Sequence, residues 1–148
     1  MRTIIFGDAG GTDIRASRAA RLAGSGIDAA FPLWGMGTRQ LSRQILASGI
    51  RAVVTRIDPF LIEPRWLGQP FAEGFLGALG KHADPCGEHG EFHTFTCDGP
   101  GFGRAIAVTT RGVRHQDGAV YAEVTEADVP AGGSAVQGWC GHWREHSA

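Results

Sequence analysis

TIIFGDAGGTDIRASRAARLAGSGIDAAFPLW, residues 3–34, is the stretch that decides the fold class. It opens with a short apolar run, Thr3–Phe6, which predicts a buried strand that ends at a Gly-Asp turn. Apolar residues at helical spacing follow from Thr12 until a glycine stop at Gly24. The segment Ile27–Trp34 then predicts a second strand. A strand, a helix and a strand in this order are typical of a parallel α/β unit.

The same order continues for one more helix and one more strand. Thr38 can cap a helix that Gly49 closes, and Ile50–Ile57 predicts a third strand. The expected fold class is therefore α/β, with a partial Rossmann-like parallel sheet in residues 1–58. Ligands of such sheets bind at the carboxyl ends of the strands, so the loops expected at that edge are Gly7-Asp8, Trp34-Gly35 and Asp58-Pro59.

Residues 59–130 show a different pattern, which predicts a small α+β region. Two short helical segments are expected, at Glu63–Leu67 and Phe71–Leu79. Two alternating strands, Arg104–Thr110 and Ala119–Val124, are expected around a turn near Gln116–Gly118. Residues 131–148 are rich in glycine and lack periodicity, so we expect them to form a flexible C-terminal tail.

The composition is that of a globular chain in a reducing compartment. Of its 148 residues, 43% are hydrophobic and 20% are charged, with a net charge of -1. This charge argues against a general nucleic-acid binder. The apolar runs are too short to span a bilayer, and the start lacks a signal-peptide pattern, so no membrane partner is expected. Three cysteines without a C-x-x-C pair predict a cytoplasmic protein.

A second stretch, DPCGEHGEFHTFTCDGP at residues 84–100, concentrates the reactive side chains. It predicts an extended run with Glu91 and His93 on one face, and with Glu88 in the turn before them. Carboxylates can hold a cationic substrate, and a histidine can transfer protons near neutral pH. Such a cluster is costly to bury unpaired, so it should line a cleft or bind a ligand. A solvated turn followed by a polar strand face is the alternative, which the pattern alone favours.

Two further motifs favour ordinary structural roles. Cysteine and histidine side chains suit zinc, but their spacing matches no standard finger, so no metal site is expected from Cys86, His89, His93 and Cys97. The segment Asp8–Asp13 superficially resembles the Ser-Gly-Gly-x-Asp-Ser loop of the PP-loop ATP pyrophosphatases. Ala9 and Ile14 stand where both serines should be, and an ordinary strand-to-helix turn is therefore favoured. Trp34 lies at the expected ligand edge and is a candidate substrate-binding residue.

Several segments, in the same order along Thr3–Val124, resemble the diphthine-ammonia ligase family. That family contains ATP-binding proteins of the PP-loop class, which are adenine nucleotide alpha hydrolase-like. The segments are Phe6-Gly7-Asp8, Asp13-Ile14-Arg15, Phe31–Gly35, Gly49–Asp58, Trp66–Gly68 and, most specifically, Asp84–Phe95 with Asp98-Gly99-Pro100.

The resemblance implies a nucleotide sheet of the HUP/PP-loop type and an ATP-dependent amide-forming ligase. In such enzymes a carboxyl group, that of diphthine on an elongation factor, is activated by ATP with Mg as an acyl-adenylate, and ammonia then displaces AMP. The resemblance implies that Gly7 and Asp8 border the nucleotide cleft. It implies an acceptor-facing motif with Glu91 and His93 as catalytic residues and with substrate-binding positions at Glu88, Gly90 and Thr94.

This chain resembles only the C-terminal portion of that family, because its first strand corresponds to one that follows the PP-loop half. It is therefore expected to be weak or inactive alone, and to need a PP-loop-bearing partner chain or a homodimer. Its acceptor would be a small-molecule or protein carboxyl group. The alternatives are a non-catalytic module that binds a small molecule or a protein, and a truncated remnant of the enzyme.

Overall fold

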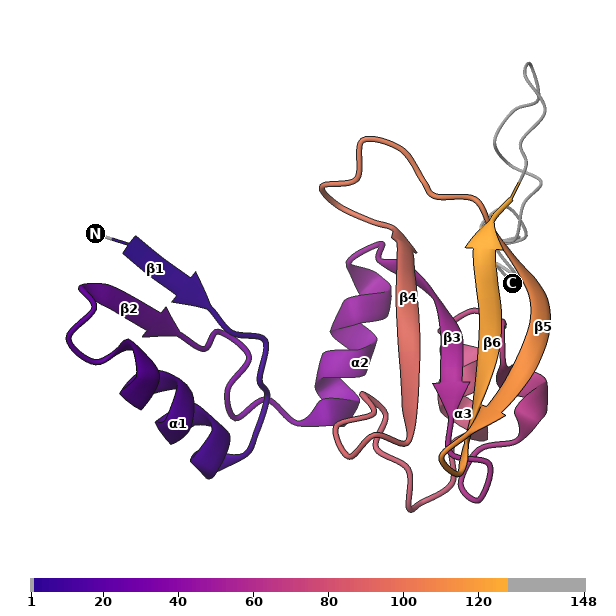
Figure 1. Cartoon of the computed structure of the whole chain (residues 1–148), viewed down its shortest axis with the longest axis horizontal. Helices are drawn as coiled ribbons and strands as arrows, with labels where there is room; N and C mark the ends of the chain where they lie inside the picture. Colours follow the sequence, from indigo (N-terminus) through magenta and orange to yellow (C-terminus); the bar gives the residue numbers. More distant parts are fainter. Residues whose placement is uncertain (1, 128–148) are drawn as a thin grey trace. The chain divides into compact units, whose positions relative to one another are not determined.

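A computed structural model describes residues 2–127 of the chain (Figure 1). The chain divides after Ser42 into two compact units, and the division falls within helix α2 (Thr38–Ala47). The tail predicted at 131–148, with Trp139, Cys140 and Trp143, lies outside the described residues.

The first unit contains a two-stranded parallel sheet. Strand β1 (Arg2–Ile5) pairs with β2 (Ile27–Ala30), and helix α1 (Thr12–Leu22) connects them. The pairing runs from Arg2 opposite Ile27 to Ile5 opposite Ala30. The predicted parallel strand-helix-strand order is therefore confirmed for residues 2–30, although β2 is shorter than the predicted segment. The prediction that the first strand is buried was wrong, because all four residues of β1 are exposed.

The prediction that Ile50–Ile57 adds a third parallel strand was wrong. Strand β3 (Arg51–Ile57) belongs instead to a four-stranded antiparallel sheet with the order β4-β3-β6-β5. A short apolar run buried on both faces has the same pattern in either kind of sheet, and Ala52, Val53 and Val54 are all buried. The parallel sheet of the described chain is thus limited to β1 and β2, and a Rossmann-like fold stays a prediction. The functional division predicted at residue 58 remains a prediction.

The second unit is built on the antiparallel sheet and short helices. Strands β4 (Phe92–Asp98), β5 (Val108–Gln116) and β6 (Ala119–Glu126) join β3, while η1 (Pro64–Trp66) and α3 (Glu73–Ala78) fall within the two predicted helical segments. The hairpin between β5 and β6 turns at Asp117 and Gly118, whose φ angles are 50° and 76°. Positive φ at both central residues is the geometry of a tight hairpin turn, which lies where the sequence predicted it. The first strand was placed too early, because β5 begins at Val108 rather than at Arg104 and continues to Gln116.

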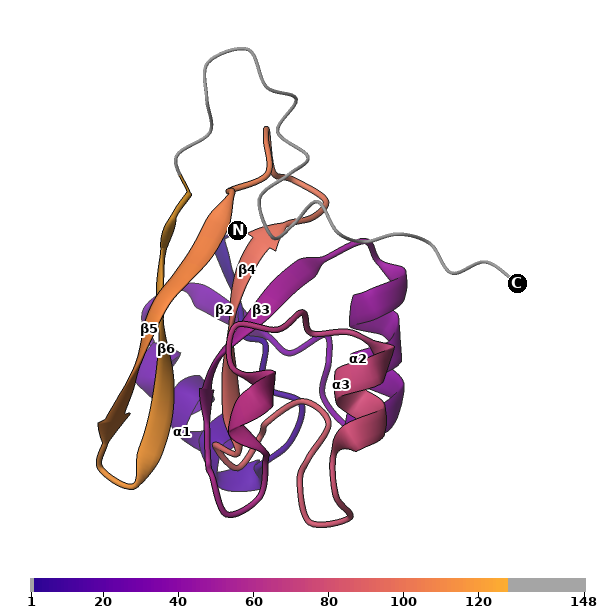
Figure 2. The same cartoon turned by 90° about the vertical axis from the view of Figure 1, so that its right-hand side faces the viewer.

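The main core lies on the face of the sheet that the helices cover (Figure 2). Phe92, Ile57 and Val120 stand opposite one another on β4, β3 and β6, and all three are buried. Phe75 of α3 packs edge-to-face on Phe92, with ring centroids 4.9 Å apart. Burying an aromatic or aliphatic side chain contributes about 1.5–3 kcal/mol, so this face anchors β4 against the helices.

A smaller cluster lies on the opposite face of the sheet. It contains Val53, Cys97 and Val108, with Ile106 packed against it. The amide of Ile106 donates to the carbonyl of Cys97 over 2.8 Å, which ties the loop after β4 to that strand. Phe92 and Cys97, at the two ends of β4, are thus buried in different clusters. No helix among the described residues is long and apolar enough to cross a membrane.

Candidate functional site

The loops that follow β1 and β2 meet at the carboxyl edge of the parallel sheet. The amide of Gly35 donates to the carbonyl of Ala9 over 3.0 Å. Phe6 and Phe31, which directly follow the two strands, stack with ring centroids 5.2 Å apart. The prediction that the Gly7-Asp8 and Trp34-Gly35 loops share one edge is confirmed. The Asp58-Pro59 loop is not part of this edge, because β3 lies in the other sheet.

Asp8 is held by a bidentate ion pair with Arg18 of α1. Arg18 Nε lies 2.6 Å from Asp8 Oδ2, and Nη2 lies 3.0 Å from Oδ1. The hydrogen bonds from Arg18 lower the pKa of the Asp8 carboxyl below its usual value of 3.8. The guanidinium also lies 4.9 Å above the centre of the Phe6 ring. Asp8 therefore fixes α1 to the end of β1, while Gly7 beside it is exposed.

Trp34 takes part in an aromatic cluster with Arg15. The guanidinium carbon of Arg15 lies 4.9 Å from the centre of the Trp34 ring and 5.2 Å from that of Phe31. The two rings meet edge-on at 6.2 Å. Trp34 is half-buried, so part of its ring remains available to a ligand. Its predicted substrate-binding role stays a prediction.

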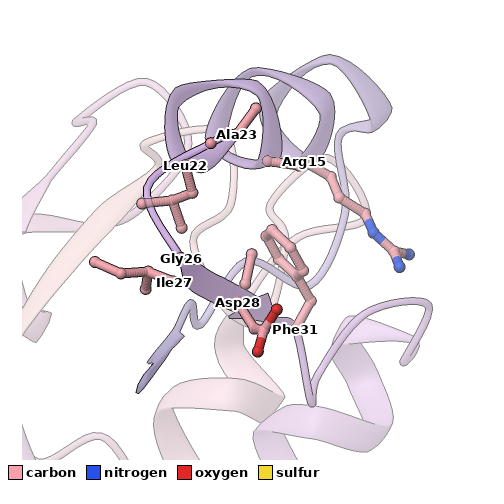
Figure 3. A pocket seen from close by; sticks show the side chains of 10 residues that line it. Arg15, Leu22, Ala23, Gly26, Ile27, Asp28 and Phe31 are labelled. Carbon is pink, nitrogen blue, oxygen red and sulfur yellow. The ribbon is translucent and has the colours of Figure 1, made fainter. Parts of the chain in front are cut away.

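An open groove of about 550 Å³ lies along α1 and β2 (Figure 3). Leu22 and Ile27 lie toward one end of it, and Phe31 and Arg15 lie toward the other. Sequence reasoning did not predict this groove, because it depends on how the helix packs on the strand. The lining residues are Arg15, Ala19, Leu22, Ala23, Gly24, Gly26, Ile27, Asp28, Ala29 and Phe31.

The loop between β1 and α1 leads directly into the first turn of the helix. The amides of Ile14 and Arg15 both donate to the carbonyl of Gly11, over 3.0 and 3.2 Å, and so are used inside the helix. Gly11 adopts a φ of 83° at the start of the helix without a side-chain cap. Residues 2–127 contain no group of three or more acidic, histidine or cysteine side chains placed to hold a metal ion. The ATP and Mg implied by the resemblance stay a prediction.

In the second unit, Glu91 organises the loop that precedes β4. Its side chain is buried, and its Oε1 and Oε2 accept hydrogen bonds from the amides of Asp84 and His89, over 2.9 and 3.0 Å. Its own carbonyl accepts a hydrogen bond from the amide of Asp58 over 2.8 Å. These two donors compensate the cost of burying the Glu91 carboxylate. Residues 84–91 therefore fold around this side chain.

Two glycines allow this loop to turn tightly. Gly87 and Gly90 adopt φ angles of 69° and 83°. A Cβ atom at Gly87 would lie 2.8 Å from the carbonyl oxygen of Phe92, which excludes any side chain there without a shift of the backbone. Glu88 lies between the two turns and is exposed. The loop thus presents the Glu88 carboxylate to solvent between two glycine turns.

A row of four polar side chains crosses the antiparallel sheet next to this loop. Strands β4, β3, β6 and β5 run side by side (Figure 1), and their register places His93 opposite Arg56, Arg56 opposite Tyr121, and Tyr121 opposite Arg114. Paired residues on antiparallel strands project to one face. This face is opposite to that of the neighbouring buried residues Phe92, Ile57 and Val120. We call His93, Arg56, Tyr121 and Arg114 the arginine row.

The arginine row is joined to the loop by Arg56, whose guanidinium donates to the carbonyl of Gly90. Sequence analysis predicted only His93 of this row. The other three residues come from strands whose pairing partners cannot be read from one sequence, so no local signal identifies them.

No protein-family model matches the chain. Comparison with curated proteins finds diphthine-ammonia ligases from rat, cattle and zebrafish. The rat protein is 35% identical over 83 residues, 53% of this chain and 31% of the relative. The cattle protein is 31% identical over 97 residues, 62% of this chain and 36% of the relative. The zebrafish protein is 35% identical over 95 residues, 59% of this chain and 36% of the relative. The chain is similar to diphthine-ammonia ligases over part of its length.

This similarity confirms the resemblance that the sequence motifs indicated, and the matches span about a third of each curated relative. Within the second unit, the residues of the predicted acceptor motif differ in their solvent exposure. His93 and Thr94 are exposed on β4, and Glu88 is exposed in the loop, whereas Glu91 is buried. Glu91 precedes the first residue of β4, and its carboxylate is buried while His93 is exposed. The roles predicted for these residues stay predictions.

Proposed function

We propose that this chain binds the acceptor substrate of an ATP-dependent amide-forming ligase. The observation that carries the proposal is the partial similarity to diphthine-ammonia ligases, together with a rigid loop at the most specific motif of the resemblance. The acceptor is a carboxyl group on a small molecule or a protein, diphthine on an elongation factor being the first candidate.

In this proposal the loop at 84–91 and strand β4 contribute different residues to acceptor binding. Glu88 holds a cationic or amine-bearing group of the acceptor, since its carboxylate is exposed on a fixed frame. His93 orients the acceptor or transfers a proton, with Gly90 and Thr94 beside it. Glu91 is a positioning residue rather than a group that touches substrate, because its carboxylate is already bound to two backbone amides.

The nucleotide half of the reaction is assigned to a PP-loop-bearing partner chain, which would hold ATP and Mg next to Gly7 and Asp8. Strand β1 carries exposed apolar side chains, with Ile4 at 39% and Ile5 at 70% exposure. A two-stranded sheet with an open edge and apolar exposure favours further pairing. A second copy of this chain is the other candidate for that edge. We also propose that the chain acts in the cytoplasm.

A binding module without catalysis is the second candidate function. The open groove along α1 and β2 supports it, since its volume of about 550 Å³ is in the range of small-molecule sites. A truncated remnant of the enzyme would keep both the groove and the loop without a partner.

Calorimetric titration of the purified 148-residue chain tests the proposed function. An elongation factor that carries diphthine is expected to bind, and His93→Ala and Glu88→Gln are each expected to weaken that binding. The control Arg111→Gln changes an exposed charge on β5 and should leave it unchanged. Mg-ATP alone is expected to give no heat. Absence of acceptor binding would contradict the proposal, and micromolar Mg-ATP binding would contradict the assignment of the nucleotide to a partner.

A further inference from the structure

The arginine row carries two guanidinium groups that form no ion pair with a carboxylate in the part of the chain from residue 2 to residue 127. Both lie instead against Tyr121. The guanidinium carbon of Arg56 is 5.9 Å from the centre of that ring, and the carbon of Arg114 is 5.2 Å from it. Arg56 and Tyr121 are half-buried, so water only partly compensates the charge of Arg56, whereas Arg114 is exposed. Such a charge favours an anionic ligand.

The two guanidinium groups are held in place before any ligand arrives. Arg56 donates to the carbonyl of Gly90, and Arg114 donates to the side-chain oxygen of Gln116. A flexible arginine loses side-chain entropy when it binds, and prior hydrogen bonds reduce that loss. The planar fork of donors on arginine matches the paired oxygens of carboxylates and phosphates. The row is therefore suited to hold one oxyanion group.

The acidic side chains nearest in sequence and register leave this charge largely intact. The carboxylate of Glu91, two residues before His93, is bound to two backbone amides of the loop. Glu123 lies on the same face, two residues after Tyr121 and opposite Gly112. Its Oε2 would lie 3.0 Å from a Cβ atom at Gly112, which places it over that glycine. Asp117 lies in the turn after β5, and its carboxylate accepts a hydrogen bond from the side-chain amide of Gln116 over 3.1 Å. Among residues 2–127, neither Glu123 nor Asp117 forms an ion pair with Arg56 or Arg114.

We propose that the arginine row binds a carboxylate or phosphate group of the ligand that the chain recognises. Arg56 and Arg114 supply the charge, and the Tyr121 hydroxyl and the His93 imidazole supply further hydrogen-bond donors. The identity of that ligand as the acceptor rests on the proposed function. The proposal of an anion site rests on the strand register, on the contacts of both guanidinium groups with the Tyr121 ring, and on their lack of an ion pair among residues 2–127.

Nuclear magnetic resonance of the full chain tests the site with two probes, inorganic phosphate and glutarate. The Nε–Hε signals of Arg56 and Arg114 are expected to shift saturably with one common dissociation constant. Arg56→Gln and Arg114→Gln are each expected to weaken binding about tenfold, the effect of losing roughly 1.4 kcal/mol. Arg111→Gln, an equal charge change on the same strand as Arg114, should leave the dissociation constant unchanged. Tighter binding of phosphate or of glutarate identifies which oxyanion the row prefers.

Two results would overturn the site: shifts that do not saturate with either probe, and equal weakening by Arg111→Gln and by the two row variants. Because these anions are not the acceptor, the two proposals fail separately. Binding of the anions without binding of the diphthine-bearing factor would leave the row intact and contradict the proposed function. Binding of the factor without binding of either anion would support the proposed function and contradict the anion site.

Discussion

The Oε1 atom of Glu91 lies 2.9 Å from the amide nitrogen of Asp84, seven residues earlier in the chain. With the second bond to the amide of His89, this contact closes the loop before β4. Glu91→Gln replaces one acceptor oxygen with an amide group that faces a backbone donor. We expect a loss of about 1–3 kcal/mol in the free energy of unfolding, measured by urea denaturation.

Glu88→Gln is the matched control for this change, since Glu88 lies in the same loop and is exposed. It makes the same chemical substitution without a buried hydrogen bond, so the free energy of unfolding should stay within about 0.5 kcal/mol of the parent. Equal effects of the two substitutions would mean that the Glu91 carboxylate does not organise the loop.

Gly87 and Gly90 allow the loop geometry to be tested with a matched pair of alanines. Both have positive φ angles, 69° and 83°, so both alanines carry backbone strain of about 1–2 kcal/mol. Only Gly87→Ala adds a clash, with the new Cβ 2.8 Å from the carbonyl oxygen of Phe92, whereas the space beside Gly90 is open. The denaturation midpoint should therefore fall further for Gly87→Ala. The same midpoint for both variants would rule out the close approach.

The ion pair between Asp8 and Arg18 predicts a pH dependence for the first unit. The pKa of Asp8 is lowered in the folded chain, chiefly by the hydrogen bonds from Arg18. Its contribution to stability is then complete above the unfolded-state pKa of about 3.9, and is lost as the pH falls toward the lower folded value. A carboxyl-carbon titration should place the Asp8 midpoint below 3.8. Arg18→Gln should return that midpoint upward, and an unchanged midpoint would exclude the ion pair in solution.

The elements whose signals are local could be predicted from the sequence. The parallel strand-helix-strand order of residues 3–34 follows from apolar runs and a helical spacing that lie next to each other in the chain. The β5-β6 hairpin follows from Asp117-Gly118, a turn signal between two alternating runs. The partner of β3 could not be predicted in this way. Buried β-branched residues suit a parallel or an antiparallel neighbour equally, and only tertiary pairing with β4 and β6 decides between them.

In the candidate site, too, features with a local sequence signal could be predicted, and features that depend on tertiary structure could not. The glycines and carboxylates of residues 84–91 indicate a loop in the sequence. Whether one of these carboxylates is buried depends on the backbone around it. Glu88 and Glu91 have the same chemistry three residues apart, and only Glu91 lies where two amides converge on it. Arg56, Tyr121 and Arg114 come together only through the sheet register, so the arginine row has no local sequence signature.

Phe75 links the helices to the strand that carries His93. Its side chain is fully buried, and its ring meets those of Trp66, Phe71 and Phe92 with centroids 5.6, 6.0 and 4.9 Å away. Phe75→Ala should lower the free energy of unfolding by about 3–5 kcal/mol, because it leaves a cavity beneath β4. Phe60→Ala is the control, since Phe60 is 91% exposed and should cost almost nothing. At a temperature where Phe75→Ala remains folded, amide exchange should quicken along β4 more than along β5, because β4 rests directly on the vacated ring. Uniform exchange along both strands would show that the aromatic cluster does not hold β4 in place.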